Sequence, residues 1–442
     1  ATRGTHVREL ARIVRALFDR DGDRVATVLG GGDCDDGDAS VNPSAPEVAG
    51  DGIDQDCDGV DLAAAVAPVP QELGALRAAL RAGAAAQALL ARTREMNVVV
   101  IAIDALRADT VARTADHRGV FPNLLGFFDR SRTFRRAFAP ASATDVSVCG
   151  IVTGRLDPFG TVETTLPEAM RASGRQTRAI FPSEVLRHAG QVLLERGIDR
   201  PERYVNDGAQ RDVGRNTTSV KATDLAVLAI AELAAAERPF YLWLHYFDVH
   251  EHHQIEADDR HLAELGEVGA DRSPAGHYRA LAALTDRELG RVFAALAERG
   301  VAERTIVVVL SDHGESLGED PRLPVTHGGF VYNALTHVVL AIQVPGLAAA
   351  EIDAPRSLLD LTPTLLELLG APPLPAMDGV SLLALLVDEA PEELRREPRT
   401  MALTEEEQWG IIDWPLKLMV RPAENLTELY DLDQDFAERD NL

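Results

Sequence analysis

The sequence predicts an α/β protein with a mostly parallel sheet flanked by helices, a small loop-rich module at the N-terminus and a small antiparallel subdomain at the C-terminus. Apolar runs typical of strands buried on both faces occupy residues 97–103, 241–246 and 305–310. Segments with helical periodicity occupy residues 183–196, 223–237, 275–299 and 357–369. Because such strands and helices alternate along the chain, we expect a largely parallel sheet. Short strand-like pieces at 401–432 predict the antiparallel subdomain.

The length and composition are those of a folded protein with several parts. The chain has 442 residues, of which 46% are hydrophobic and 26% charged, which is ordinary for a soluble globular protein. We expect a helix and an Asp-rich module at 1–61, then a linker (62–70) and an Ala/Leu/Arg helix (71–94) within 62–96. The main domain then spans 97–442, with its small subdomain from about 395.

The acidic excess is large and unevenly spread. The net charge is −26, which argues against a nucleic-acid partner. Between residues 19 and 61, 13 acidic residues stand against two arginines, a concentration that favours sites for hard cations. No run of about 20 apolar residues occurs, so no membrane-spanning helix is predicted. The start is neither an initiator methionine nor a signal peptide, so membrane association through a segment outside this sequence stays open.

Alternating aspartates in the N-terminal module predict calcium ligands. The apolar positions of residues 5–18 predict an amphipathic helix that runs directly into the first aspartates. Alternation brings carboxylates around one cation, and a following glycine permits the sharp turn. No glutamate stands at the twelfth loop position, so these are not standard EF-hands. The candidate ligands are Asp19, Asp21, Asp23, Asp33, Asp35, Asp54, Asp56 and Asp58.

Two cysteines accompany this acidic segment. In an oxidising compartment Cys34 and Cys57 would close a small loop that has no core of its own, which predicts a disulfide and an extracytoplasmic location. The alternative is two free thiols near a metal. Cys149 lies in an apolar stretch and is expected to be buried. Residues 31–61 also resemble the Asp-rich, two-cysteine calcium modules of secreted bacterial proteins, which implies structural rather than catalytic calcium.

Polar, metal-type side chains follow the predicted strands. Asp104 follows the first strand, and Asp312 and His313 follow the strand at 305–310. The strand at 241–246 runs into a segment with one aspartate and several histidines, and His327 lies in a later Gly/Pro-bounded loop. Because the C-terminal ends of parallel strands meet at one edge of a sheet, these groups predict a divalent-cation site with nitrogen and oxygen ligands.

Seven segments of the main domain resemble, in order, landmarks of the sulfatase branch of the alkaline phosphatase superfamily. They are NVVVIAIDALRADT, the segment ending Thr153-Gly154-Arg155, YLWLHYFDVH, VVVLSDHGESLGE, THGGFVYNAL, DLTPTLLELLG and the closing NLTELYDLDQDFAERDNL. The resemblance implies an alkaline-phosphatase-like fold and hydrolysis or transfer of an ester at phosphorus or sulfur. It also implies that Asp104, Asp312 and His313 bind a catalytic metal (zinc, manganese or calcium). His250 and His327 match histidines that contact the transferred group.

The resemblance places the nucleophile at Thr144, ten residues before Gly154. Sulfatases carry C/S-x-P-S-R here and oxidise the first residue to formylglycine, whereas this chain has Thr-Asp-Val-Ser-Val. A lysine that sulfatases use is also missing, because Lys221 and Lys417 stand elsewhere. A threonine instead resembles the branch that transfers phosphoethanolamine or phosphoglycerol or cleaves phosphodiesters, with the metal lowering the hydroxyl pKa before in-line attack. Thr144 could also serve as a helix N-cap.

The number of catalytic metals stays open. Asp248 and His252 have the D-x3-H spacing that two-metal phosphodiesterases of the superfamily use together with a late histidine. The second alignment takes residues 248–250 as the D-P-H of the sulfatase-like branch, with valine for proline. We prefer this alignment, because residues 245–247 fit it too.

The sequence therefore predicts a metal-dependent phosphoester hydrolase or phosphotransferase with Thr144 as nucleophile. The expected substrate is a small molecule, a lipid head group or a glycan ester. A true sulfatase acting on sulfate esters is the alternative. A third possibility is a non-catalytic surface protein braced by calcium.

Overall fold

The computed structural model describes most of the chain after residue 70 and parts of residues 20–57. It describes residues 71–442 except 158–161, 183–192, 194, 205–215, 257–258, 389, 396–399 and 405–407, together with 20–22, 25–27, 33–35, 37–43, 45, 53–55 and 57. Some predictions lie outside the described residues: the helix at 5–18, the ligands Asp19, Asp23, Asp56 and Asp58, the linker and most of the helix at 183–196. The chain divides into two compact units, Ala1–Ala78 and Ala79–Leu442.

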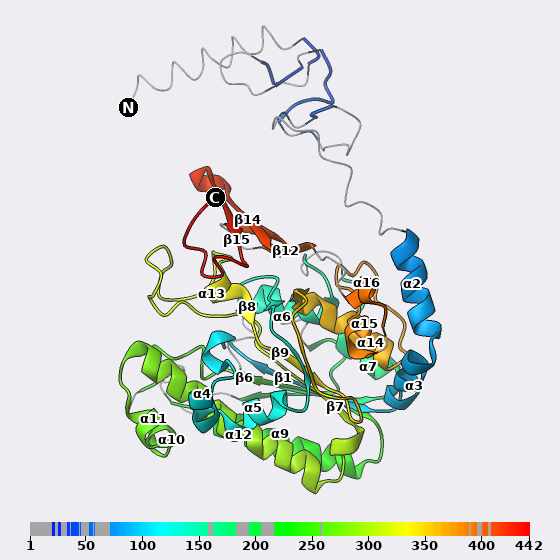
Figure 1. Ribbon diagram of the computed structural model, residues 1–442, viewed down its shortest axis with the longest axis vertical. Helices are drawn as coiled ribbons and strands as arrows, with labels where there is room; N and C mark the ends of the chain where they lie inside the picture. The colour runs from blue at the N-terminus through cyan, green and yellow to red at the C-terminus, as the bar shows by residue number, and fades with distance from the viewer. Residues whose placement is uncertain are drawn as a thin grey trace. The chain divides into compact units, whose positions relative to one another are not determined.

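An eight-stranded sheet forms the centre of the larger unit (Figure 1). Its strand order is β10-β2-β9-β7-β1-β6-β4-β5. The strands are β1 (Asn97–Ile103), β2 (Arg132–Phe134), β4 (Gln176–Pro182), β5 (Arg200–Tyr204), β6 (Phe240–Tyr246), β7 (Thr305–Leu310), β9 (Leu340–Gln343) and β10 (Ala350–Ile352). Strands β7, β1, β6, β4 and β5 are parallel, β9 is antiparallel to both neighbours, and β10 is parallel to β2. The three predicted strands, β1, β6 and β7, are confirmed and form the buried centre.

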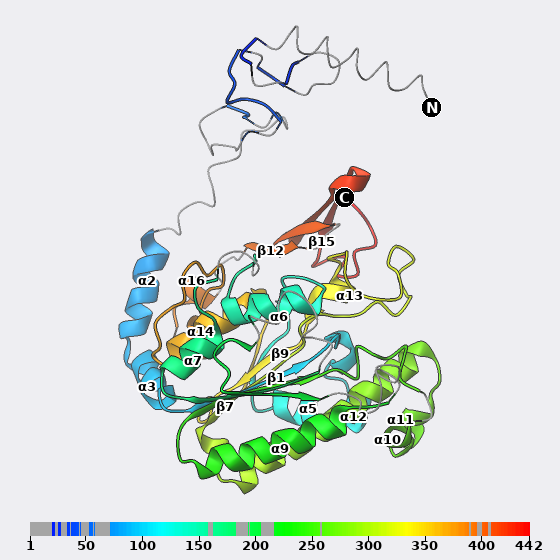
Figure 2. The ribbon, with the colours of Figure 1, turned by 180° about the vertical axis from the view of Figure 1, so that it is seen from behind.

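Helices cover both faces of this sheet, as the parallel topology requires. One face carries α3 (Ala84–Thr93), α6 (Thr144–Thr153), α7 (Leu166–Ala172) and α14 (Leu361–Leu368), and the other carries α5 (Pro122–Phe128), α9 (Ser219–Ala235) and α12 (Pro274–Glu298) (Figure 2). Shorter helices are α4 (Ala115–Val120), α10 (Arg260–Ala263), α11 (Glu267–Ala270), α13 (Asn333–Thr336), α15 (Leu383–Leu386) and α16 (Glu392–Arg395). No helix in the described part of the chain is both long and apolar enough to cross a bilayer.

Two predicted helices differ in detail from the observed ones. The segment 71–94 forms two helices, α2 (Gln71–Ala82) and α3, because Gly83 interrupts the helical run. The segment 357–369 begins with a 3-10 turn, η3 (Leu358–Asp360), before α14. Three further 3-10 turns are η1 (Asp109–Val111), η2 (Ala302–Arg304) and η4 (Pro422–Glu424).

Two small sheets complete the larger unit. Strands β11 (Arg356–Ser357), β3 (Ala137–Phe138) and β8 (His337–Val338) form one. Strands β12 (Thr400–Thr404), β13 (Trp409–Asp413), β14 (Leu416–Arg421) and β15 (Leu426–Asp431) form the antiparallel C-terminal sheet that the sequence predicts. Buried and exposed residues alternate along β13 and β14, so this sheet packs one face against the loop before α13.

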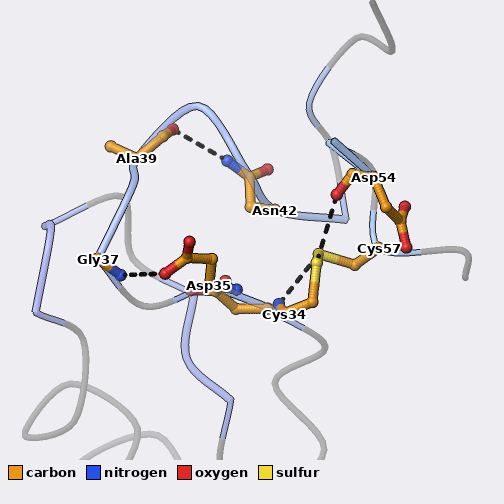
Figure 3. Close-up of a disulfide and its surroundings, with 8 residues drawn as sticks. Cys34, Asp35, Gly37, Ala39, Asn42, Asp54 and Cys57 are labelled. Carbon is orange, nitrogen blue, oxygen red and sulfur yellow. Dashed lines mark hydrogen bonds between the residues drawn. A yellow bond between two sulfur atoms is a disulfide. The ribbon is translucent and has the colours of Figure 1, made fainter. Parts of the chain in front are cut away.

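The predicted disulfide joins Cys34 to Cys57 in the N-terminal unit (Figure 3). Around it, aspartate side chains fold the backbone into tight turns. Asp33 Oδ1 accepts a hydrogen bond from the amide of Asp35 at 2.8 Å, and Asp35 Oδ1 accepts one from Gly37 at 3.1 Å. The alternating aspartates therefore shape the loop with the same oxygens that could face a cation.

Candidate active site

Three buried residues at the C-terminal ends of β1 and β7 form a metal-type cluster. Asp104 follows β1, and Asp312 and His313 follow β7, which is hydrogen-bonded to β1 in parallel. All three are fully buried. Each offers one ligand atom, and these atoms lie within 4.8 Å of one another. Among the described residues this is the one group of three or more His, Cys, Asp and Glu side chains that meets that distance.

The hydrogen bonds of Asp312 show that this cluster fits a cation. Oδ1 accepts from the amides of Ala105 at 3.2 Å and His313 at 3.0 Å, which fixes the carboxylate. Oδ2 is buried and has no hydrogen-bond partner among the described residues. An orphaned carboxylate oxygen in the interior is costly unless a cation or proton meets it. Two carboxylates and an imidazole suit zinc, manganese or a similar divalent ion.

The electrostatics of the cluster support this. Burial raises the pKa of Asp104, but the positive charge of nearby histidines outweighs it and holds that pKa well below its usual range. Burial and the charge of Asp104 raise the pKa of Asp312. Burial lowers the pKa of His313, but the two carboxylates overcome it and raise the pKa to about 10. Two carboxylates crowded together raise the pKa of one of them, and a bound cation would relieve this repulsion.

Thr144 directs its hydroxyl at this cluster. It is the first residue of α6, whose N-cap is Ala143, so the side chain is not used as a cap. Its Oγ1 lies 3.0 Å from His313 Nε2 and 3.4 Å from each carboxylate oxygen of Asp104. The Ser147 hydroxyl, one turn along α6, donates to the carbonyl of Asp312 at 2.6 Å and so ties the helix to the metal-type cluster.

His250 and His327 complete the site. Their ring centroids lie 4.5 Å apart, and the His327 ring lies 4.4 Å from that of His313. Nδ1 of His250 contacts Glu251 Oε1 at 2.8 Å, and Nδ1 of His327 contacts Glu315 Oε2 at 2.9 Å. These carboxylates fix the two rings through Nδ1, which leaves each Nε2 for a bound group.

Asp248 and His252 are not brought together with this cluster. The Asp248 carboxylate accepts four hydrogen bonds at the start of α9: from the amide and hydroxyl of Thr218 at 2.7 and 2.6 Å, and from those of Ser219 at 2.9 and 2.5 Å. His252 is buried, and neither of its ring nitrogens has a hydrogen-bond partner in the described part of the chain. Asp248 thus holds the start of α9, and among the described residues it belongs to no metal-type cluster.

One contributing residue was not assigned a role from sequence. His245 is fully buried on β6, and its Nε2 lies 3.0 Å from Asp104 Oδ2. The observation that could have revealed this contact is the register of the sheet. Ala102 of β1 pairs with His245, and Asp104, two residues on, lies on the same face. Recognising this contact requires knowing that β1 and β6 are neighbours.

The comparison with known families agrees with this geometry. The family model "Sulfatase" matches residues 96–371, which is more than half of the chain. The chain belongs to the sulfatase family. This range contains every residue of the candidate active site.

Relatives of this sulfatase-family chain match it over limited stretches. "Arylsulfatase K" of Gallus gallus is 32% identical over 186 residues, covering 37% of this chain and 32% of that protein. The "Multifunctional alkaline phosphatase superfamily protein PehA" of Trinickia caryophylli is 36% identical over 188 residues, covering 40% and 35%. The aligned part of the chain thus spans about a third of the length of these curated relatives.

Solved structures share the fold. The phosphonate monoester hydrolase of Agrobacterium radiobacter superposes with a TM-score of 0.62 at 18% identity, covering 78% of this chain and 91% of that one. Ps i-CgsB, in complex with k-i-k-neocarrahexaose, gives a TM-score of 0.63 at 15% identity, with 79% and 88% covered. The fold is therefore that of the sulfatase-like branch of the alkaline phosphatase superfamily, as expected. At the N-terminus, a metal-binding motif model named for copper-binding MopE matches residues 33–61.

Proposed function

We propose that this chain is a metal-dependent hydrolase that cleaves an ester at sulfur or phosphorus, with the Thr144 hydroxyl as nucleophile. The observation that carries the proposal is the position of Oγ1, 3.0 Å from His313 Nε2 and 3.4 Å from both oxygens of Asp104. A hydroxyl held on the ligand atoms of a metal-type cluster is placed to lose its proton and attack.

Asp104, Asp312 and His313 would hold the cation. A divalent ion there would stabilise the negative charge on the nucleophile and on the reacting group. The chain's own residues do the rest. Ser147 and His245 keep α6 and Asp104 in place. His250 and His327 can donate from Nε2 to the oxygens of the transferred group, where negative charge develops.

In the proposed reaction a bond forms between Oγ1 of Thr144 and the sulfur or phosphorus atom, while the bond to the leaving oxygen breaks. The Thr144 hydroxyl gives up its proton, and the leaving oxygen takes up a proton and departs as an alcohol. Water then cleaves the threonine ester and restores the free hydroxyl. Transfer to an acceptor alcohol would differ only in this second step.

Sulfate esters are the first substrate class to test, because curated relatives of the chain are named arylsulfatases. This reverses the order that the sequence alone suggested, in which phosphoesters came first. Phosphodiesters and phosphonates are the second class. They are supported by the threonine at the nucleophile position, and by fold similarity to a phosphonate monoester hydrolase. A glycan or other small molecule would carry the ester.

The test compares turnover of 4-nitrophenyl sulfate, bis(4-nitrophenyl) phosphate and a 4-nitrophenyl phosphonate by the metal-loaded protein. Thr144→Ser keeps the hydroxyl and should retain activity within about tenfold, whereas Thr144→Ala should lose about 1,000-fold or more. Turnover that survives in Thr144→Ala would refute the nucleophile. A wild-type protein that turns over none of the three would favour the non-catalytic alternative.

We also propose that the Asp-rich module at residues 33–61 binds a structural divalent cation, with calcium as the expected ion, in an extracytoplasmic compartment. The disulfide and the oxygen-rich composition support this. Mass spectrometry of metals in the purified protein would test it. Calcium bound by wild type and lost in Asp54→Ala would support the proposal. Copper in its place would contradict it, because a copper site prefers nitrogen and sulfur donors.

A further inference from the structure

We infer that the buried pair Lys417–Glu438, in the C-terminal sheet and tail, positions the loop that carries His313 and His327. Both side chains are positioning residues of the active site. Of the three measurements that test the inference, only the kinetic one rests on the proposed function. Metal affinity and hydrogen exchange can be measured without ester turnover.

Lys417 lies on β14 and is fully buried, which is rare for a lysine. Its ammonium contacts three oxygens: the carbonyl of Val331 at 2.6 Å, Oδ1 of Asn333 at 2.9 Å and Oε1 of Glu438 at 2.6 Å. The first two contacts are hydrogen bonds, and the third is an ion pair. Two of the three oxygens belong to the segment 331–333, which leads into α13.

Glu438 holds the same segment from the other side. Its Oε2 accepts a hydrogen bond from the amide of Asn333 at 2.6 Å, and the carbonyl of Phe436 accepts one from Asn333 Nδ2 at 2.9 Å. Glu438 has a φ of 57°, in the left-handed region. A residue with a side chain takes this conformation at a cost unless its surroundings hold it there, and here the buried ion pair does so.

From Asn333 the contacts continue into the active site. The next two residues, Ala334 and Leu335, offer carbonyls that accept hydrogen bonds from Glu315 at 3.1 Å and Gly314 at 2.7 Å. A Cβ on Gly314 would lie 2.2 Å from the carbonyl oxygen of Ala334. The strand end that presents His313 is thus in close backbone contact with α13.

The same strand end orients the second histidine. Glu315 Oε2 contacts His327 Nδ1 at 2.9 Å. Displacement of α13 would therefore shift the backbone on both sides of Gly314 and the ring of His327 together. Figures 1 and 2 both show the C-terminal strands beside α13.

A buried ion pair is weak evidence for a stabilising role, since the desolvation of two charges offsets much of their attraction. Burial lowers the pKa of Lys417 and raises that of Glu438, and their mutual attraction opposes both effects. A geometric role explains why two charged groups occupy a site that apolar side chains could fill.

The experiment compares Lys417→Met, Glu438→Gln and the double variant with Lys221→Met, a matched control on the exposed surface of α9. Three quantities are measured: the metal Kd by competition with a chromophoric chelator, hydrogen exchange of residues 327–336, and kcat and KM. Thermal unfolding is recorded alongside. The double variant removes both charges, so it should fold even if a single variant leaves an unpaired charge and does not.

We expect Lys417→Met and the double variant to lose roughly 10-fold to 100-fold in kcat, with a smaller change in KM, because a displacement of about 1 Å can cost 100-fold. Metal affinity should weaken by about 10-fold or more, and exchange in 327–336 should accelerate. The double variant should recover thermal stability without recovering these properties. Recovery of kcat and metal affinity together with stability would overturn the inference, as would unchanged values in a folded Lys417→Met.

If the wild type turns over no ester, the proposed function fails while this inference is still decided. The metal Kd and the exchange of residues 327–336 then carry the test. Unchanged values of both in the double variant would refute the positioning role.

Discussion

Asp312 and Asp248 both lie just after a central strand of the same sheet, yet the structure uses them differently. Asp248 accepts four hydrogen bonds from Thr218 and Ser219 at the start of α9. Asp312 accepts two backbone hydrogen bonds on Oδ1, and its Oδ2 has no hydrogen-bond partner among the described residues. A buried carboxylate oxygen can accept hydrogen bonds from nearby donors or bind a cation. Which of the two it does depends on the donors that the fold brings within reach.

The residues around the two aspartates differ in the same way. Asp312 shares its site with Asp104, His313 and the hydroxyl of Thr144. The nearby candidate His252 is buried with both ring nitrogens unpaired in the described structure, and it belongs to no metal-type cluster there. Spacing in the sequence suggests ligands at both places, but only one place has ligand atoms that converge.

The largest effect is expected from Asp312→Asn, which replaces one ligand oxygen by an amide group. Activity towards the accepted ester should fall by at least about 1,000-fold, because a bound cation supplies several kcal/mol of transition-state stabilisation. Removing the metal from wild type with a chelator should have the same effect and be reversed by added metal. Asp353→Asn, on an exposed aspartate, is the matched control and should leave kcat unchanged. Activity retained in Asp312→Asn would remove this residue from the site.

A smaller loss is expected from His245→Ala. His245 orients Asp104 through the 3.0 Å contact, and loss of such a supporting residue typically costs 10-fold to 100-fold in metal affinity or activity. Metal Kd measured by chelator competition checks this. His245→Gln offers an amide to the same carboxylate and should recover part of the affinity. Equal metal affinity in wild type and His245→Ala would show that the contact has no positioning role.

Asp248→Asn should change stability and not metal binding. An amide in place of one oxygen would face donors at the start of α9, so about 1–3 kcal/mol of unfolding free energy should be lost. Urea denaturation measures this, and the metal content of the folded protein should equal that of wild type. A missing metal equivalent in Asp248→Asn would restore the two-metal hypothesis.

The sequence predicted the elements and residues whose signal is local. Strands β1, β6 and β7 are continuous apolar runs, and their ends supplied Asp104, Asp312 and His313. Strand β4 was not predicted, because its sequence Gln-Thr-Arg-Ala-Ile-Phe-Pro is mixed and its buried Arg178 depends on ion pairs with Glu202 and Glu232. The role of Asp248 also lay beyond sequence, because it depends on Thr218 and Ser219, which only the fold brings to it.

The smallest effect is expected from His252→Met. Burial lowers the pKa of His252, and the neighbouring His253 adds to this while Glu315 opposes it. Below the ordinary histidine pKa of about 6.5, the unfolded chain therefore takes up a proton that the folded chain excludes. Stability falls as the pH drops through that value.

His252→Met should make the unfolding free energy less dependent on pH between about 6.5 and 5, and at pH 8 it should stay within about 1 kcal/mol of wild type. Urea unfolding at a series of pH values measures both. A loss of bound metal in this variant would contradict the assignment of His252 outside the metal site.

The metal content of Asp312→Asn and Asp248→Asn, purified in parallel with wild type, tests the central claim most directly. The claim predicts that Asp312→Asn loses one metal equivalent per chain relative to wild type, while Asp248→Asn loses none. The N-terminal module is the same in all three proteins, so its ions cancel in the comparison. Equal metal content in wild type and Asp312→Asn, or a loss confined to Asp248→Asn, would contradict it.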